Sequence, residues 1–267
     1  MGPSDLLAIV SGSLVGFSLG LIGGGGSILA VPLLVYVVGV RSPHVAIGTS
    51  SIAVALSAFA NLINHARRGH VCWPVALLFA ASGICGAAAG STLGKYTDGE
   101  KLLILFGLLM IVVAASMAMK REGGGAAKVH LERANAPPIV GIGLAVGAVA
   151  GFFGIGGGFL IVPGLIFATG MPIINAIGSS LLSVGSFGLA TAINYAFSGL
   201  VDWGIACEFI AGGIIGGLLG MLLANRLATK GNVLNRIFAG LIFAVAGYVL
   251  YRSGQALGPL PARLAQS

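Results

Sequence analysis

Long apolar runs separated by short polar stretches cover almost the whole chain. They lie at 5–22, 28–40, 46–66, 71–94, 102–119, 139–153, 159–170, 175–197, 201–224 and 233–251. Three runs in each half reach or approach the roughly 20 apolar residues that a membrane-spanning helix needs. The runs 28–40 and 159–170 are too short to cross a bilayer upright. The pattern predicts an all-α polytopic membrane protein with eight to ten transmembrane segments.

The two halves of the chain carry the same motifs. Three motifs occur twice: GLIGGGGSILAVP (20–32) with GFFGIGGGFLIVP (151–163), AIGTSS (46–51) with AIGSSL (176–181), and NHARRGHVCW (64–73) with NYAFSGLVDW (194–203). The offset is 131 residues for the first motif and 130 for the other two. This constancy predicts an internal duplication with about five segments in each copy. The first repeat spans 1–119, a hydrophilic linker spans 120–138, and the second repeat spans 139–267.

The distribution of lysine and arginine favours inverted repeats. Repeats with an odd number of crossings have opposite orientations, which is a recurring plan of secondary transporters. This arrangement gathers most cations on the linker side: Arg67, Arg68, Lys120, Arg121, Lys128, Arg133, Arg226, Lys230 and Arg236. By the positive-inside rule the linker is then cytoplasmic and both termini lie outside. A parallel arrangement would send the cations at 226–236 to the face opposite the linker.

Consecutive glycines interrupt the apolar pattern at Gly23–Gly26 and again at Gly156–Gly158. Glycine weakens a helix interior by roughly 1 kcal/mol relative to alanine. A contiguous run makes no packing stripe, and a proline follows each run, at Pro32 and Pro163. We therefore expect a helix break at each run. The free N–H groups of the segment that follows a break can bind an anion, and pseudo-symmetry would bring both breaks to one central pocket.

Another set of glycines has helical spacing and predicts close contacts between helices. Its members are Gly83, Gly86, Gly90, Gly212, Gly213, Gly216, Gly217 and Gly220.

Polar side chains near the breaks complete the predicted binding site. The candidate substrate-binding residues are Gly23, Gly24, Gly25, Gly26, Ser27, Thr49, Ser50, Ser51, Asn64, Gly156, Gly157, Gly158, Ser179, Ser180 and Asn194. The hydroxyls can bind an oxyanion, but they can equally cap a helix or bond to the preceding turn. The asparagines can line a polar path or hold helices together. Arg67 and Arg68 form either an electropositive vestibule or an ordinary cytoplasmic loop.

Composition narrows the classes of function. The chain is 57% hydrophobic and 8% charged, whereas soluble domains carry about 25% charged residues. The net charge of +7 comes from cations between apolar runs, which indicates topology signals rather than nucleic-acid binding. Three widely spaced cysteines give neither a disulfide framework nor a metal-ligand pair. Since nucleophile–base, metal-ligand and dinucleotide motifs are also missing, we expect no enzyme, no metal and no cofactor.

The duplicated motifs also carry a family resemblance. The first is the glycine run that ends in a proline, Gly23 to Pro32 and Gly154 to Pro163. The second is the Ala-Ile-Gly-Thr/Ser-Ser sequence that follows each run. The third is Asn…Arg-Arg-Gly-His-Val-x-Trp at 64–73, which is repeated in altered form at 194–203. On these residues the chain resembles, over essentially its whole length, the sulfite exporter TauE/SafE family of bacterial membrane transporters. The resemblance implies export of sulfite, sulfonates or other small anions across the inner membrane. One position differs from the family pattern. Where this chain has Cys72, members of the family often have an acidic residue, as this chain has at the matching position of the second copy, Asp202.

The sequence thus predicts a secondary transporter that exports a small anion bound between the two glycine breaks. With the cell interior negative, each negative charge that leaves gains about 2.3 kcal/mol per 100 mV. One repeat rocking against the other would provide alternating access. The alternative is a metal-cation or proton-coupled transporter of the same fold, for which Asp202 and Glu208 are the acids to consider. The sequence leaves open the anion, the coupling ion, channel against carrier, and monomer against homo-oligomer.

Overall fold

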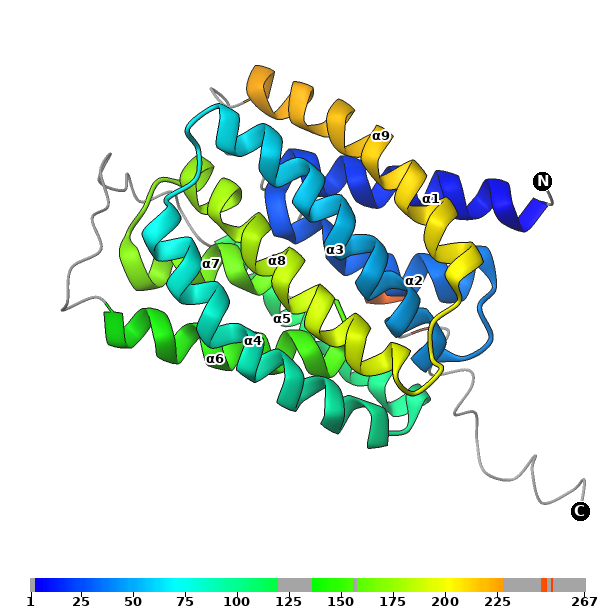
Figure 1. Cartoon of the computed structure of the whole chain (residues 1–267). Helices are drawn as coiled ribbons and strands as arrows, with labels where there is room; N and C mark the ends of the chain where they lie inside the picture. Colours follow the sequence, from blue (N-terminus) through cyan, green and yellow to red (C-terminus); the bar gives the residue numbers. More distant parts are fainter. Residues whose placement is uncertain (1–2, 120–135, 156–157, 228–245, 249–250, 252–267) are drawn as a thin grey trace, which may run out of the picture.

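The computed structural model describes residues 3–119, 136–155, 158–227, 246–248 and 251, and in these ranges every regular element is a helix (Figure 1). In chain order they are α1 (Pro3–Ile22), the 3₁₀ helix η1 (Gly23–Leu29), α2 (Ala30–Leu33), the π-helical turn η2 (Leu34–Val38), α3 (Pro43–Arg67), α4 (Trp73–Tyr96), α5 (Gly99–Met119), α6 (Ala136–Phe153), α7 (Gly158–Thr169), α8 (Ile173–Ala196) and α9 (Trp203–Leu227). The predicted all-α class is confirmed.

Five of the described helices are long and apolar enough to cross a membrane: α3, α4, α6, α8 and α9. Shorter apolar helices cover Asp5–Leu21, Gly26–Val38 and Leu160–Thr169, so the two short runs expected from the sequence are short helical segments. Most of the predicted linker and most of the last apolar run, 233–251, lie outside the described residues. The described chain resumes at Ala136, so α6 includes the last residues assigned to the linker.

Helices α1, α3 and α9 pack side by side and run in the same direction; we call them the first bundle (Figure 1). Along the α1–α9 contact, Gly12 meets Phe209 and Gly20 meets Gly217. Helices α4, α6 and α8 form a second bundle that also runs one way. The two bundles meet where α3 and α8 cross antiparallel, since the start of α3 at Gly48 contacts Tyr195 near the end of α8.

The predicted packing glycines are confirmed as helix contacts. A Cβ added to Gly83 would strike the ring of Phe187 in α8, and one added to Gly86 would strike a backbone carbonyl of α6. On α9, a Cβ added to Gly216 would strike the carbonyl of Ser13 in α1. Small residues allow backbones to approach this closely in membranes, where dispersion contacts drive helix association.

These contacts recur at the offset of the sequence motifs. Gly16 of α1 lies against Gly213 of α9, and Gly147 of α6 lies against Gly83 of α4. The first helix of each half therefore packs most extensively on the third long helix of the other half, α1 on α9 and α6 on α4. If one half rocked as a rigid body, both contacts would break. The two bundles, rather than the two sequence halves, are therefore the units that can move as rigid bodies.

Candidate functional site

The first glycine run ends α1 at Ile22, and Gly23 adopts a left-handed conformation with φ +72°. L-residues with a side chain rarely take this conformation, because Cβ crowds the carbonyl oxygen. The chain then continues as the 3₁₀ helix η1, which contains Gly24–Gly26 and the buried Ser27. A Cβ on Gly23 would come within 2.8 Å of Cγ2 of Ile177, so this break lies against the start of α8.

The second break has the matching geometry. Helix α6 ends at Phe153, and Gly154 adopts φ +65° with its backbone against the Ile47 side chain at the start of α3. The left-handed residue therefore precedes the glycine run named from the sequence. Of that run, Gly158 is the first residue of α7, and positions 156 and 157 lie outside the described residues.

Two predicted hydroxyls tie each helix start to a loop of the other half. The Asp202 backbone N–H donates to Thr49 Oγ1 at 2.9 Å, and the Cys72 N–H donates to Ser179 Oγ at 2.9 Å. Both hydroxyls are acceptors in these bonds. A hydroxyl has one hydrogen to donate and two lone pairs, so each keeps its hydrogen for a further partner.

The other hydroxyls bond mainly within their own helix. Ser50 Oγ donates to the Ile47 carbonyl at 3.0 Å, and Ser180 Oγ donates to the Ile177 carbonyl at 2.8 Å. Ser51 Oγ lies 2.7 Å from the carbonyl of Ile47 and 2.7 Å from that of Gly154. Ser51 therefore connects the start of α3 directly to the second break.

These contacts define two half-sites. The first half-site contains Gly23, the α8 start at Ile177–Ser180 and loop 68–72. The second contains Gly154, the α3 start at Ile47–Ser51 and loop 198–202. Because α3 and α8 are antiparallel, Thr49 and Ser179 lie roughly 20 Å apart along the helices at 1.5 Å rise per residue. The predicted hydroxyls thus gather in two places rather than around one central point.

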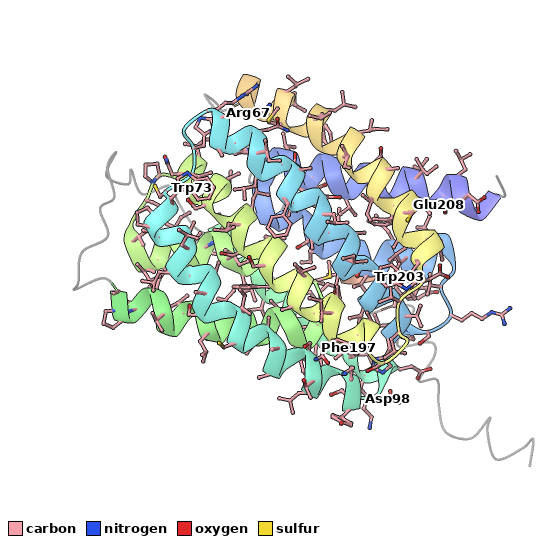
Figure 2. The ribbon with its side chains drawn as sticks, viewed as in Figure 1. Arg67, Trp73, Asp98, Phe197, Trp203 and Glu208 are labelled. Carbon is pink, nitrogen blue, oxygen red and sulfur yellow. The ribbon has the colours of Figure 1, made fainter. Side chains whose placement is uncertain are left out.

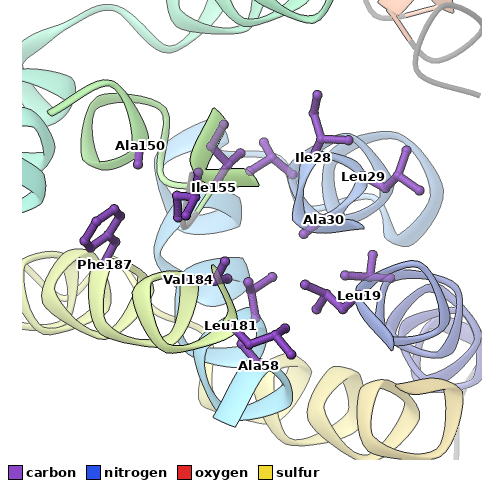
Figure 3. Close-up of a cluster of buried hydrophobic side chains, with 14 of the residues drawn as sticks. Leu19, Ile28, Leu29, Ala30, Ala58, Ala150, Ile155, Leu181, Val184 and Phe187 are labelled. Atoms are coloured by element: carbon purple, nitrogen blue, oxygen red, sulfur yellow. The ribbon is translucent and has the colours of Figure 1, made fainter. Parts of the chain in front are cut away.

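Apolar side chains fill the space between the two breaks. Segments η1 and α7 pack against each other, and the buried cluster there includes Ile28, Leu29, Ile155 and Leu181 (Figure 3). Each half-site borders this core, which separates one from the other.

The two predicted asparagines lie in different environments. Asn194 Oδ1 accepts a hydrogen bond from Lys95 Nζ at 2.7 Å, and its Nδ2 donates to Ser91 Oγ at 2.6 Å and to Thr92 Oγ1 at 3.0 Å. Asn194 therefore joins α8 to α4. Asn64, its counterpart in sequence, donates to the Ala60 carbonyl of its own helix at 3.4 Å.

This difference predicts unequal effects of truncation. Asn194→Ala should lower the free energy of unfolding by about 2 kcal/mol, since Lys95 and two hydroxyls lose partners, whereas Asn64→Ala should cost about 0.5 kcal/mol. Thermal unfolding of the two purified variants in the same detergent makes the comparison. Equal melting temperatures would show that Asn194 does not hold the helices together.

Charged residues lie at both ends of the molecule (Figure 2), and Lys95 is hydrogen-bonded to Ser198 beside the second half-site. Arg67 and Arg68 are exposed at the end of α3, beside the first half-site. At the other end, Asp5, Asp202 and Glu208 line a pocket of about 240 Å³ with the turn at Val38–Val40. Asp202 Oδ1 also accepts from the Ile205 N–H at 3.1 Å and so caps α9.

The buried polar groups are almost all neutral. Among the residues that the structure describes, the fully buried polar side chains are serines, threonines, Asn61 and His65. No described Asp, Glu, Lys or Arg belongs to this set. The interior therefore offers hydroxyls and backbone groups rather than fixed charges.

Sequence reasoning missed the partners of the breaks and two histidines. Ile47 and Ile177 read as ordinary apolar residues, although both belong to the duplicated AIG motif whose offset could have pointed to them. His65 is 1% exposed and its ring centroid lies 5.8 Å from that of His70. Nothing in the sequence spacing of the two histidines places them beside a break.

Comparison with known proteins agrees with a membrane transporter. The family model described as "Sulfite exporter TauE/SafE" matches residues 8–249. A "Probable membrane transporter protein" of Xylella fastidiosa (strain Temecula1) is 56% identical over 95% of this chain and 98% of that protein. "Probable membrane transporter protein YunE" of Bacillus subtilis (strain 168) is 27% identical over 85% of this chain and 91% of its own length.

Proposed function

The chain belongs to the sulfite exporter TauE/SafE family, and from this premise we propose that it exports a small sulfur-containing or organic anion through its two half-sites. It is a multi-pass membrane transporter and not an enzyme. We place it in the bacterial inner membrane, with the linker and the Arg67–Arg68 end in the cytoplasm.

The two halves act as inverted repeats in this proposal. Support comes from the antiparallel crossing of α3 and α8, which carry the same motif. It also comes from matched pairs of contacts, such as Gly23 with Ile177 and Gly154 with Ile47. A two-fold axis in the membrane plane relates such pairs in inverted-repeat transporters. Each half-site then faces one side of the membrane, and movement of the two bundles opens them in turn.

The observation that carries the proposal is the composition of each half-site. A helix break at a left-handed glycine lies against a helix start that presents a hydroxyl, Thr49 or Ser179, whose oxygen accepts a backbone N–H and whose hydrogen is left to donate. Such donors bind oxyanions without fixed positive charge. Binding of this kind is weak enough for release, which an exporter requires.

Charge at the first half-site supports binding of an anion there. Arg67 and Arg68 raise the local anion concentration at that half-site. At the opposite end the carboxylates of Asp5, Asp202 and Glu208 are accompanied by Lys95, whose Nζ donates to Ser198 Oγ. Cation transport is the alternative, but the described residues hold no group of three or more His, Cys, Asp or Glu side chains that could bind a metal ion.

Voltage should drive the flux. Purified protein in vesicles loaded with sulfite, methanesulfonate or thiosulfate should release its anion faster when a potassium-diffusion potential makes the interior negative. Each unit charge gains about 2.3 kcal/mol per 100 mV. Reversal of the potential should reverse the direction of net flux. Protein-free vesicles are the control, and lack of movement of all three anions under either polarity would refute the proposal.

A further inference from the structure

The buried imidazole of His65 lies beside the first glycine break. His65 is 1% exposed, and its ring nitrogens have no hydrogen-bond partner apart from a weak bond to the backbone of Gly20, three residues before the left-handed Gly23. A neutral imidazole has one N–H to donate and one nitrogen to accept, and leaving a ring nitrogen unmet in a buried place is costly. A ligand that supplies hydrogen-bond partners would remove that cost.

A second imidazole covers the same half-site from the loop. The His70 ring lies 5.8 Å from that of His65, centroid to centroid, and Nδ1 of His70 is buried without a hydrogen-bond partner. The His70 backbone carbonyl packs on Gly178, one residue before Ser179. Two imidazoles thus lie beside the first break and the hydroxyl-bearing start of α8.

The second half-site differs at the two matched positions. Tyr195 takes the place of His65, and Leu200 takes the place of His70. Tyr195 is likewise buried with an unpartnered hydroxyl, and the Leu200 carbonyl packs on Gly48 as the His70 carbonyl packs on Gly178. The backbone geometry is therefore repeated, but the first half-site has a pair of imidazoles, whereas the second has the single imidazole of His44, whose ring centroid lies 6.4 Å from that of Tyr195.

We propose that the first half-site binds its anion together with a proton, which the His65–His70 pair holds. An imidazolium donates from both ring nitrogens, so protonation converts one unmet acceptor into a second donor toward the oxyanion. The anion in turn supplies the negative charge that a buried imidazolium needs. This inference rests on the proposed function and changes one of its expectations. A monoanion such as methanesulfonate that moves with one proton carries no net charge and does not respond to voltage, whereas a dianion such as thiosulfate still carries one negative charge and does.

The surrounding charges make proton binding depend on the anion. Arg68 and His70 are the charged and titratable side chains that act on His65, with Arg67 and Cys72 also in this segment. The described side chains of α1, η1, α8 and α9 at this level include no titratable group. Burial and the neighbouring Arg68 lower the pKa of His70 below its ordinary value. The His70 ring is therefore harder to protonate than a free imidazole when no anion is present, and an arriving anion favours its protonation.

The test separates a proton gradient from voltage. Vesicles with equal potassium on both sides and valinomycin hold the membrane potential at zero, and the external pH is set about one unit below the internal pH. Methanesulfonate is the probe because its own charge does not change in this range. A coupled proton should drive its accumulation on the alkaline side toward about tenfold. His65→Gln should abolish this accumulation and His70→Gln should reduce it. His44→Gln removes an imidazole near the opposite half-site and should keep the wild-type response to pH.

Each outcome of this experiment supports or overturns a specific part of the proposal. Wild-type flux that follows voltage but ignores the proton gradient overturns proton coupling and leaves anion export standing. A proton-driven accumulation that persists in both His65→Gln and His70→Gln assigns the proton to other groups and also overturns the inference. Absence of methanesulfonate flux under either force, repeated with thiosulfate, refutes the proposed export itself. If His65→Gln does not give folded protein, the loop variant His70→Gln and the wild-type response decide.

Discussion

A Gly147→Val substitution is expected to lower the free energy of unfolding by about 3 kcal/mol, among the largest effects of any single change in the described chain. The Cβ of valine would strike the carbonyl of Gly83, where α6 and α4 approach backbone to backbone. The carbonyl cannot move aside as a side chain could, so the two helices must separate. Separation loses dispersion contacts along the whole helix pair.

Gly141→Val is the matched control. It lies on the same helix, and a Cβ there meets no atom within 4 Å. Helix propensity changes equally at the two positions, so the difference between the variants isolates the contact with α4. Thermal unfolding of both proteins, followed by size-exclusion chromatography in one detergent, measures that difference. Similar melting temperatures for the two variants would mean that α4 and α6 do not pack as described.

A Gly154→Ala substitution should reduce anion flux by about tenfold or more, the factor that corresponds to 1.4 kcal/mol. Alanine in the left-handed conformation costs roughly 1–2 kcal/mol, and its Cβ would also strike Ile47. Both effects push the second break away from the start of α3. The hydrogen bond from Ser51 to the Gly154 carbonyl would lengthen or break.

Gly170→Ala provides the control for strain, because Gly170 also has a left-handed φ, +68°, but a Cβ there has nothing within 4 Å. It should keep most of the flux. The double variant Gly154→Ala/Ile47→Ala should recover part of the lost activity, since the smaller residue makes room for the new methyl group. Flux from vesicles under an inside-negative potential gives all four values. Wild-type flux in Gly154→Ala would remove the second break from the mechanism.

The sequence was sufficient for features that depend on period and repetition. Hydropathy predicted the helices, contiguous glycines predicted the breaks, and the spacing of Gly83, Gly86 and Gly90 predicted a contact face. These features rest on local backbone preference, which a single chain reveals. The position of the left-handed residue in the second half did not follow from the sequence, because Ile155 separates Gly154 from the contiguous run at 156–158.

The local sequence pattern does not reveal which helices and loops pack against each other. The glycine stripe on α9 shows that another helix approaches closely, but not that this helix is α1. The roles of Thr49 and Ser179 depend on loops of the other half that meet them only in the folded chain. His65 and His70 likewise become a pair through the geometry of a turn at Gly69, whose left-handed φ of +72° folds the loop back.

The interlocked packing has a consequence for synthesis in the cell. Ser13 Oγ of α1 donates to the Gly212 carbonyl of α9 across 199 residues of chain. At a translation rate of roughly 10 residues per second, α1 waits about 20 s in the membrane before its partner is made, whereas α4 meets α6 within several seconds. During that interval the glycine face of α1 can pair with other helices or be held by the insertion machinery. The lifetime of this unpaired helix sets the period in which membrane quality control can act on the nascent transporter.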